Sequence, residues 1–282
     1  MTNIDIDYLR GWIGKTRENA DEISPRLSSS LAAILDESVN LPVGSEAPVG
    51  IHWCLSPDIV AMSGLGPDGH PQRGGFLPPV PFPRRMWAGG ELRFHGDFRS
   101  GDAVTRRSRI DDVVLKEGKT GALCFVTVTH DYYTGRGLAL SERHDIVYRE
   151  VDAKGSAPAP LTGPDAPADE QFSIEGTPTL LMRYSAVTFN GHRIHYDRNY
   201  CVREERYPGL VVHGPLQATY MLRLATKMNG GRLPSVFSFR GVRPLFDGTT
   251  FTINGRSDIE GAMTLWVSGA DGLTTMTAAA KG

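Results

Sequence analysis

The segment Phe189–Asp197, which reads FNGHRIHYD, concentrates side chains suited to proton transfer within nine residues. An imidazole has an intrinsic pKa near ~6.5, so His192 and His195 can each gain or lose a proton near neutral pH. Asp197 could join them as a metal ligand, but no second His/Cys cluster is evident to complete a coordination shell. A plain polar turn is the third reading. The pattern favours acid–base catalysis, and we expect no metal.

A second candidate site lies where an apolar segment, YPGLVV, meets His213-Gly214 and a helix follows from Pro215. Backbone N–H groups at a helix N-terminus lack intrahelical partners and carry the positive end of the helix dipole. Glycine lets a substrate oxygen approach closely, so the Gly214 N–H is a candidate oxyanion donor. A glycine that only permits the turn would look the same, and both readings stay open.

Two helices must position these residues. The first begins with Ser24 as N-cap and Pro25 at the first helical position, and it places an apolar stripe on one face: Leu27, Leu31, Ile34 and Leu35. The second, GPLQATYMLRLATKM, is apolar round most of its circumference and stops at Asn229-Gly230-Gly231. A helix of that kind is predicted to be buried.

The strand pattern repeats in the two halves. Phe94-His95-Gly96 precedes Asp102 with the same spacing as Phe239-Arg240-Gly241 precedes Asp247. Two runs typical of strands follow each aspartate, with turns expected at Gly118 and at or beyond Gly255. Tyr184–Phe189 also reads as β-prone, and YPGLVV as strand-like. Each half is therefore expected to carry an antiparallel sheet wrapped round its helix.

Asp152–Glu170 is rich in Ala, Pro, Gly and acids, which predicts a linker. The expected division is a domain over residues 1–150, a linker over 151–170 and a second domain over 171–282.

Composition excludes several classes of function. A 40% hydrophobic fraction can build a core, and a net charge of -2 offers no basic field for nucleic acid. No leader and no apolar run of roughly 18 residues is found, so we expect a cytoplasmic chain without membrane contact. Cys54, Cys124 and Cys201 form no CxxC pair and are expected as buried thiols. GLGPDG, residues 64–69, fits a dinucleotide fingerprint by letter, but Pro67 and the prolines after it cannot open a helix. No cofactor is expected.

A histidine five positions after a polar residue, in a loop ahead of His-Gly and a buried helix, resembles the MaoC-like, type 2 enoyl-CoA hydratase family. That family's loop reads Asp-x-Asn-Pro-x-His, with the aspartate and histidine as catalytic pair. Here Asn190 stands at the aspartate, His192 at the asparagine, Arg193 at the proline and His195 at the histidine. The chain is similar to the double-hotdog branch of this family, which shows FNxHxIHxD in its second half. The N-terminal half of that branch resembles a fatty-acid-synthase dehydratase, and residues 66–94 of this chain, GPDGHPQRGGFLPPVPFPRRMWAGGELRF, are similar to it.

The resemblance implies an α+β double hotdog, two repeats of a long antiparallel sheet wrapped round a central helix. It implies reversible hydration of a 2-enoyl-CoA or dehydration of a 3-hydroxyacyl-CoA, for a short branched dicarboxylic acyl group such as mesaconyl or itaconyl. His195 is expected to carry the proton, Asn190 to hold water or orient His195, and Gly214 to stabilise the thioester oxygen. His192 is the reserve proton carrier. The first half, lacking such a loop, is expected to be catalytically silent and to accommodate substrate.

Several residues are expected to bind substrate: Arg84, Arg85, Trp87, His192, Arg193 and His213. Arg84 and Arg85 could meet CoA phosphates or a substrate carboxylate, or be solvated surface arginines. Arg193 is the candidate for the acyl carboxylate. A fatty-acid 3-hydroxyacyl-thioester dehydratase, a thioesterase and a non-catalytic acyl-CoA binding protein are the alternatives; a thioesterase would place a carboxylate near the helix terminus, which Asn190 does not supply. Because hotdog sheets tend to pair, we expect a homodimer.

Overall fold

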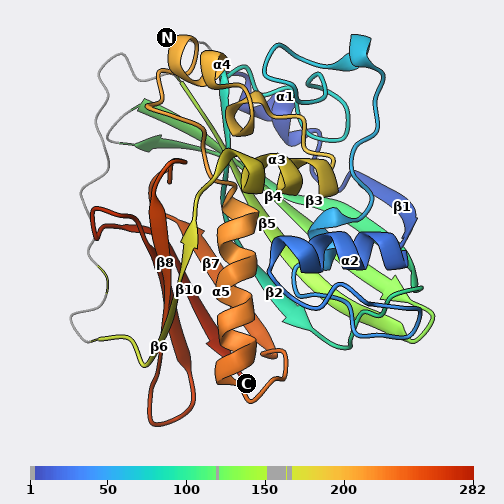
Figure 1. Ribbon diagram of the computed structural model, residues 1–282. Coiled ribbons are helices and arrows are strands. Elements are labelled where there is room, and N and C mark those ends of the chain that lie inside the picture. Colours follow the sequence, from blue (N-terminus) through green and yellow to red (C-terminus); the bar gives the residue numbers. More distant parts are fainter. Residues whose placement is uncertain (1–3, 119–120, 151–162, 164–166) are drawn as a thin grey trace.

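The computed structural model describes residues 4–118, 121–150, 163 and 167–282 of the chain. Ten strands within these residues form one antiparallel sheet in the order β1-β3-β4-β5-β2-β7-β10-β9-β8-β6 (Figure 1). In the N-terminal half they are β1 (Thr16–Glu22), β2 (Arg84–Phe94), β3 (Ala103–Gly118), β4 (Gly121–Thr134) and β5 (Gly137–Arg149). In the C-terminal half they are β6 (Glu170–Glu175), β7 (Val236–Gly241), β8 (Thr250–Ser257), β9 (Met263–Ser268) and β10 (Thr274–Lys281).

The helices lie between these strands in the sequence. The N-terminal half has α1 (Ile6–Arg10) and α2 (Pro25–Ile34), with 3-10 turns η1 (Ile51–Cys54) and η2 (Met62–Gly64). The C-terminal half has α3 (Pro178–Val187), η3 (Arg193–His195), α4 (Arg198–Arg203) and α5 (Gly214–Met228).

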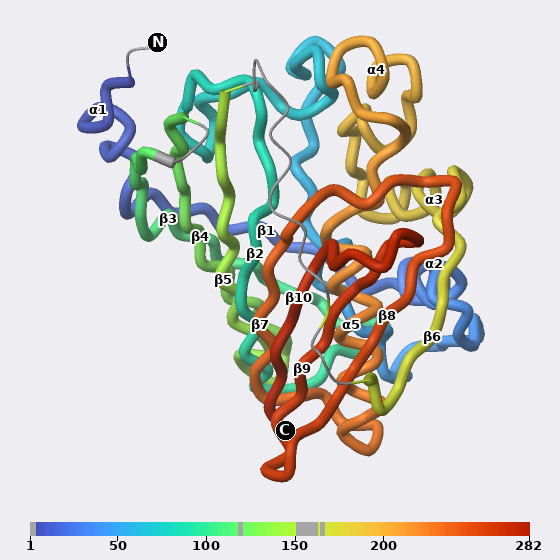
Figure 2. Tube along the Cα trace, turned by 90° about the vertical axis from the view of Figure 1, so that its left-hand side faces the viewer, coloured from blue at the N-terminus to red at the C-terminus, as the bar shows by residue number. Residues whose placement is uncertain are grey.

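The sheet confirms the predicted internal repeat. Reading inward from either edge, each half contributes its first, third, fourth, fifth and second strand in that order. The halves join where β2 pairs with β7, with Leu92 opposite Phe237. The strands that carry the repeated Phe-x-Gly patterns are therefore direct neighbours, and Figure 2 shows the two halves of the sheet on either side of this junction.

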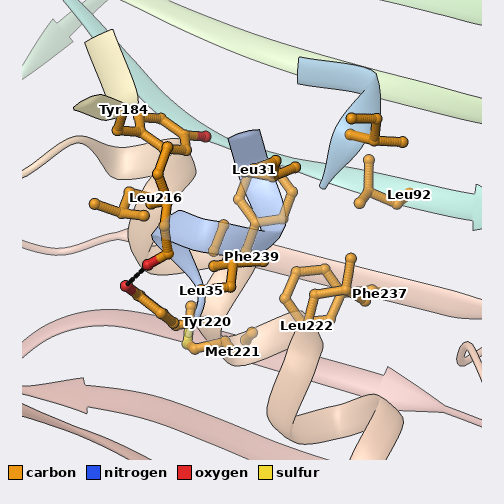
Figure 3. Packing of buried hydrophobic residues seen from close by; sticks show 14 of the residues in the cluster. Leu31, Leu35, Leu92, Tyr184, Leu216, Tyr220, Met221, Leu222, Phe237 and Phe239 are labelled. Carbon is orange, nitrogen blue, oxygen red and sulfur yellow. Dashed lines mark hydrogen bonds between the residues drawn. The ribbon is translucent and has the colours of Figure 1, made fainter. Parts of the chain in front are cut away.

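Both predicted helices form where expected. The Ser24 Oγ accepts the Leu27 N–H at 3.2 Å, which caps α2. α5 contacts all five strands of its half and buries residues round its circumference, as its sequence predicts. Leu31 and Leu35 pack near Tyr220 and Met221 of α5 in a shared core, and the Tyr220 hydroxyl donates to the Ile34 carbonyl at 3.2 Å (Figure 3). The α+β, double-hotdog expectation is confirmed.

Some local predictions are wrong. The β-prone run Tyr184–Phe189 is helical up to Val187, because Thr177 caps α3 through the Leu180 N–H at 3.1 Å and Pro178 opens its first turn. The turn predicted at or beyond Gly255 does form, at Asp258–Gly261, and Gly255 itself lies inside β8.

The apolar segment before His213 also departs from its prediction, because it forms only an isolated bridge, Val211 to Phe246. The three cysteines are free and buried, as predicted. The GLGPDG segment is a loop, also as predicted. Most of the predicted linker, residues 151–162 and 164–166, lies outside the described residues, so the domain division stays a prediction. None of the helices in the described part of the chain is long and apolar enough to cross a bilayer.

Candidate active site

A cavity of about 1740 Å³ runs between the two halves. Its walls come from β2, from the loop between α3 and α4, and from the start of α5. Of the residues predicted from sequence, it brings together Arg84, Arg85, Trp87, Asn190, His192, Arg193, His195 and Gly214. These residues therefore line one cavity, although they come from both halves of the chain.

The histidine loop is held by short-range hydrogen bonds. Phe189 ends α3 with a left-handed φ of 50°, and the Asn190 N–H donates to the Ser185 carbonyl at 2.8 Å. The Asn190 Oδ1 accepts the His192 N–H at 3.0 Å, so this amide shapes the loop. Asp197, whose residue type would also allow a metal ligand, caps α4 by accepting the Tyr200 N–H at 3.0 Å. The Asn190 side chain therefore stabilises the backbone of the loop, whatever its role toward water.

His195 is the buried imidazole of the loop, 7% exposed. Its Nδ1 lies 2.7 Å from the Val211 carbonyl oxygen. A carbonyl only accepts, so Nδ1 carries the hydrogen and Nε2 is left with a free lone pair. Burial lowers the pKa of His195 to about 4, against the opposing effect of the Val211 bond. The ring is therefore neutral at pH 7, which is the state a general base requires.

His213 supports His195 from behind. Its ring stacks on the His195 ring with centroids 3.6 Å apart, and its Nε2 lies 2.8 Å from the Ser185 Oγ. The side chain is fully buried, and burial followed by the nearby His195 lowers its pKa well below the usual range. A fully enclosed ring cannot touch substrate, so the prediction that His213 binds substrate does not fit its position.

The start of α5 has a free backbone donor. Its N-cap residue, His213, forms no side-chain capping bond, whereas the other four α-helices of the described residues are each capped by Asp, Ser or Thr. The Gly214 N–H has no acceptor within the described part of the chain. A Cβ on Gly214 would come within 2.8 Å of the Trp87 ring, so glycine is required for this packing. Free N–H groups facing a cavity are the arrangement that stabilises an oxyanion.

Sequence reasoning missed two residues of the N-terminal half, Asp68 and His70. The Asp68 Oδ2 lies 2.9 Å from the His70 Nδ1, and the His70 ring is 4.1 Å from the His192 ring between centroids. Ligand atoms of Asp68, His70 and His192 lie within 4.8 Å of one another, a spread that could hold a cation. The direct Asp68–His70 hydrogen bond instead marks an oriented imidazole. The signal was present in GPDGHP, but nothing local links it to a loop over 120 residues away.

Burial alone would raise the Asp68 pKa, yet the bonds from His70 hold it below its usual range. The pKa of His192 falls to about 2, because burial and the neighbouring His70 and His195 disfavour its charged form. The reserve carrier is thus the less readily protonated ring of the loop.

The three arginines differ in their partners. The Arg84 Nη2 donates to the Glu205 carbonyl at 2.8 Å, and its Nε is 3.4 Å from that side chain's Oε2. Arg193 pairs with the Asp197 carboxylate at 2.8 Å. Arg85 has no acidic partner among the residues described. Burial is the main cause that lowers the pKa of His144 to about 3, and the charge of Arg85 adds to it. Of these three arginines, Arg85 is therefore the most available to an anion.

A family model described as hydroxyacyl-thioester dehydratase type 2 matches residues 50–247. The mesaconyl-C(4)-CoA hydratase of Chloroflexus aurantiacus is 42% identical over 268 residues, which cover 95% of each chain. Among solved structures, a MaoC-like dehydratase from Phytophthora capsici has a TM-score of 0.69 at 15% identity, covering 99% of both chains. A Mycobacterium tuberculosis protein with a double hotdog fold has a TM-score of 0.55 at 13% identity, covering 95% of both.

Proposed function

This chain belongs to the hydroxyacyl-thioester dehydratase type 2 family, and we propose that it catalyses the reversible addition of water to a 2-enoyl-CoA thioester. One observation carries the assignment of its site. The neutral His195, tied to the Val211 carbonyl through Nδ1, stands at the cavity beside the uncapped start of α5. A base and an oxyanion donor are the two parts that the reaction needs.

In the hydration direction, the His195 Nε2 takes a proton from water while the water oxygen bonds to Cβ. The electron pair of the double bond shifts toward the thioester carbonyl, whose oxygen becomes an enolate. The Gly214 N–H donates to that oxygen, a contact worth roughly 3 kcal/mol in comparable sites. A proton then reaches Cα to complete the 3-hydroxyacyl thioester. Dehydration follows the same path backwards.

We propose a short branched dicarboxylic acyl group, such as mesaconyl, as the substrate. The identity to the Chloroflexus aurantiacus mesaconyl-C(4)-CoA hydratase supports this choice. So does Arg85, because a guanidinium without an acidic partner can pair with the free carboxylate of such a substrate. Arg193 is a weaker candidate for the same carboxylate, since Asp197 already neutralises it.

A thioesterase is the alternative with the same fold. It would be expected to keep a carboxylate near the start of α5 to activate water. Within the described residues, the side chains and carbonyl recorded against the His195 and His213 rings are Ser185, Tyr184, His192 and the Val211 carbonyl. None of these is a carboxylate, which favours hydration over thioester hydrolysis.

The test is a spectrophotometric assay of the wild-type protein and His195→Ala with crotonyl-CoA, mesaconyl-CoA and itaconyl-CoA. Loss of a general base should lower the rate by 100-fold or more on the preferred substrate. His95→Gln is the matched control, because His95 is an exposed histidine outside the cavity. Equal background rates for wild type and His195→Ala on all three substrates, with release of free thiol, would show a thioesterase instead.

A cytoplasmic location and a homodimer remain part of the proposal. A CoA-thioester substrate and three free, buried cysteines support the location. Analytical ultracentrifugation would test the dimer.

A further inference from the structure

The histidine loop supplies only part of the proton chemistry. Hydration moves one proton off water and one onto Cα, and the family pattern divides this work between an aspartate and a histidine. Here Asn190 stands at the aspartate position, and an amide neither gains nor loses a proton near neutral pH. Its Oδ1 is also bonded to the His192 N–H. If the two transfers are divided as in that pattern, the second proton carrier therefore comes from another part of the cavity wall.

The N-terminal half presents such a group. His70 lines the cavity, and its Nδ1 donates to the Asp68 carboxylate at 2.9 Å. The Asp68 Oδ1 also accepts the His70 N–H at 3.0 Å, so one carboxylate fixes both the backbone and the ring. With Nδ1 bound, Nε2 is the free nitrogen of His70. A carboxylate behind an imidazole orients the ring and stabilises its protonated form.

The position of His70 beside the catalytic loop is built into the backbone. The Arg193 N–H donates to the Asp68 carbonyl at 2.9 Å, and the Arg193 Nη1 donates to the Pro67 carbonyl, also at 2.9 Å. Gly69, with a φ of +87°, lies so close to Gly191 that a Cβ would come 2.0 Å from the Gly191 oxygen. Figure 2 shows the cyan segment near residue 70 beside α4, which follows the catalytic loop. The two loops form one structural unit.

From this geometry we propose that His70 of the N-terminal half, oriented by Asp68, is the second proton-transferring residue of the site and exchanges the proton at Cα. The inference rests on the proposed hydration. His70 is a catalytic residue because it lines the cavity, and Asp68 is a positioning residue that acts through it. The half without the catalytic loop therefore takes part in the chemistry.

The step balances without an outside reagent. The neutral His195 takes a proton from water as the oxygen bonds to Cβ, and the protonated His70 gives its proton to Cα as the enolate collapses. The product site then holds a protonated His195 and a neutral His70. A proton then returns from His195 to His70 through water in the cavity. The His192 ring lies next to both, with its centroid 5.5 Å from that of His195 and 4.1 Å from that of His70.

Several charged and titratable groups act on the His70 ring. Burial lowers the pKa of His70 below its usual value, and the charges of Arg85 and Arg73 act in the same direction, while the bond and charge of Asp68 oppose them by favouring the protonated ring. His192 and His195 face it from the catalytic loop, where each disfavours charge on the others. Removing the Asp68 charge leaves only groups that oppose protonation, so the pKa of His70 should fall in Asp68→Asn.

The experiment measures hydration of mesaconyl-CoA and crotonyl-CoA against pH by wild type, His70→Gln and Asp68→Asn, with His95→Gln as control. His70→Gln should lose at least 100-fold in kcat with KM within about threefold of wild type. In hydration the protonated His70 donates, so kcat falls as pH rises through its pKa. Asp68→Asn should move this alkaline limb to lower pH by about one unit. A purely structural role for Asp68 would lower the rate but leave the limb in place.

A kcat of His70→Gln within threefold of wild type, or an alkaline limb that Asp68→Asn does not move, would overturn the inference. So would loss of wild-type activity on dialysis against EDTA with recovery on adding zinc, since the same side chains would then be metal ligands. The proposed function fails separately, when the wild-type protein itself does not hydrate either thioester. Asp68→Asn keeps the test usable should His70→Gln not fold.

Discussion

Each half contributes five strands to the sheet, but the helices α2 and α5 begin differently. α2 begins with Ser24, whose hydroxyl accepts the Leu27 N–H. α5 begins with His213 and Gly214, without a capping side chain. One helix start has a side-chain cap, and the other leaves the N–H of Gly214, a residue that lines the cavity, without an acceptor in the described part of the chain. Within a single repeated architecture, Ser24 marks a structural helix start, and His213-Gly214 marks the one that we propose to be catalytic.

The comparison also changes what the N-terminal half is expected to do. It lacks the FNGHRIHYD loop, and its own helix start is closed by Ser24. Its loop over residues 66–70 nevertheless docks on the catalytic loop of the other half and carries His70 to the cavity. We infer that the two halves have divided one site between them, and each prediction below perturbs one side of that division.

The largest effect is expected at the open helix start. Gly214→Ala adds a Cβ that would come 2.8 Å from the Trp87 ring, so either the ring or the first turn of α5 must shift. Misplacing the oxyanion donor should lower kcat/KM by about 100-fold. Steady-state hydration kinetics check this. A variant with wild-type kcat/KM would show that the Gly214 N–H does not contact the reacting oxygen.

Acid should destabilise both halves. Burial lowers the pKa values of His52 and His144 in the first half to about 3, and that of His195 in the second to about 4. Unfolded histidines titrate near ~6.5, so the unfolded state binds more protons below that pH. The stability contributed by these neutral rings is present above pH ~6.5 and is lost as pH falls toward their folded pKa values.

The measurement is urea unfolding between pH 7 and 5. His52→Phe removes one buried histidine of the N-terminal half. It should reduce the slope of the unfolding free energy by up to about 1.4 kcal/mol per pH unit. An unchanged slope would mean that His52 is charged in the folded protein.

A smaller effect is expected at Asn190. An aspartate can still accept the His192 N–H, so Asn190→Asp should keep the loop. It loses the amide donor and adds a negative charge beside the site, and we expect a decrease of about tenfold in kcat, or about 1.4 kcal/mol. Hydration kinetics distinguish the cases. A large gain in rate would show that the amide is a degraded carboxylate and that His70 does not replace it.

The smallest effect is expected at the closed helix start. Ser24→Ala removes the cap of α2 and should cost about 1 kcal/mol of unfolding free energy, measured in urea. Because Ser24 does not line the cavity, hydration kinetics should stay at wild-type values. A decrease in kcat/KM of Ser24→Ala under conditions where the variant is fully folded would indicate that α2 also takes part in the site.

Local signals in the sequence were sufficient for the parts of the fold that depend on neighbouring residues. Ser24-Pro25 marks the start of α2, and the all-round apolar pattern of α5 indicates its burial. Tyr184–Phe189 was wrongly predicted as a strand because its residues tolerate one, while the decisive signal, Thr177-Pro178, lies about two helical turns upstream. The N-cap at Thr177 outweighs the strand propensity of these residues.

The residues of the site likewise fall into those that local sequence predicts and those that depend on tertiary contacts. The loop spacing predicted His195 at the cavity, and His-Gly before α5 predicted the free donor. The role of His70 depends on contacts between residues 66–70 and 190–193, which no local pattern encodes. The enclosure of His213 likewise depends on Ser185 and on the stacked His195 ring. The residue types indicated acid–base chemistry, whereas tertiary contacts determine which histidine rings line the cavity and which are enclosed.

The most direct test is a crystal structure of the catalytically impaired His195→Gln protein with crotonyl-CoA bound. The account predicts the thioester oxygen about 3 Å from the Gly214 nitrogen, Cβ facing position 195 and Cα facing His70. A thioester bound away from the start of α5, or a Cα remote from the His70 ring, would contradict the claim that both halves build one hydratase site.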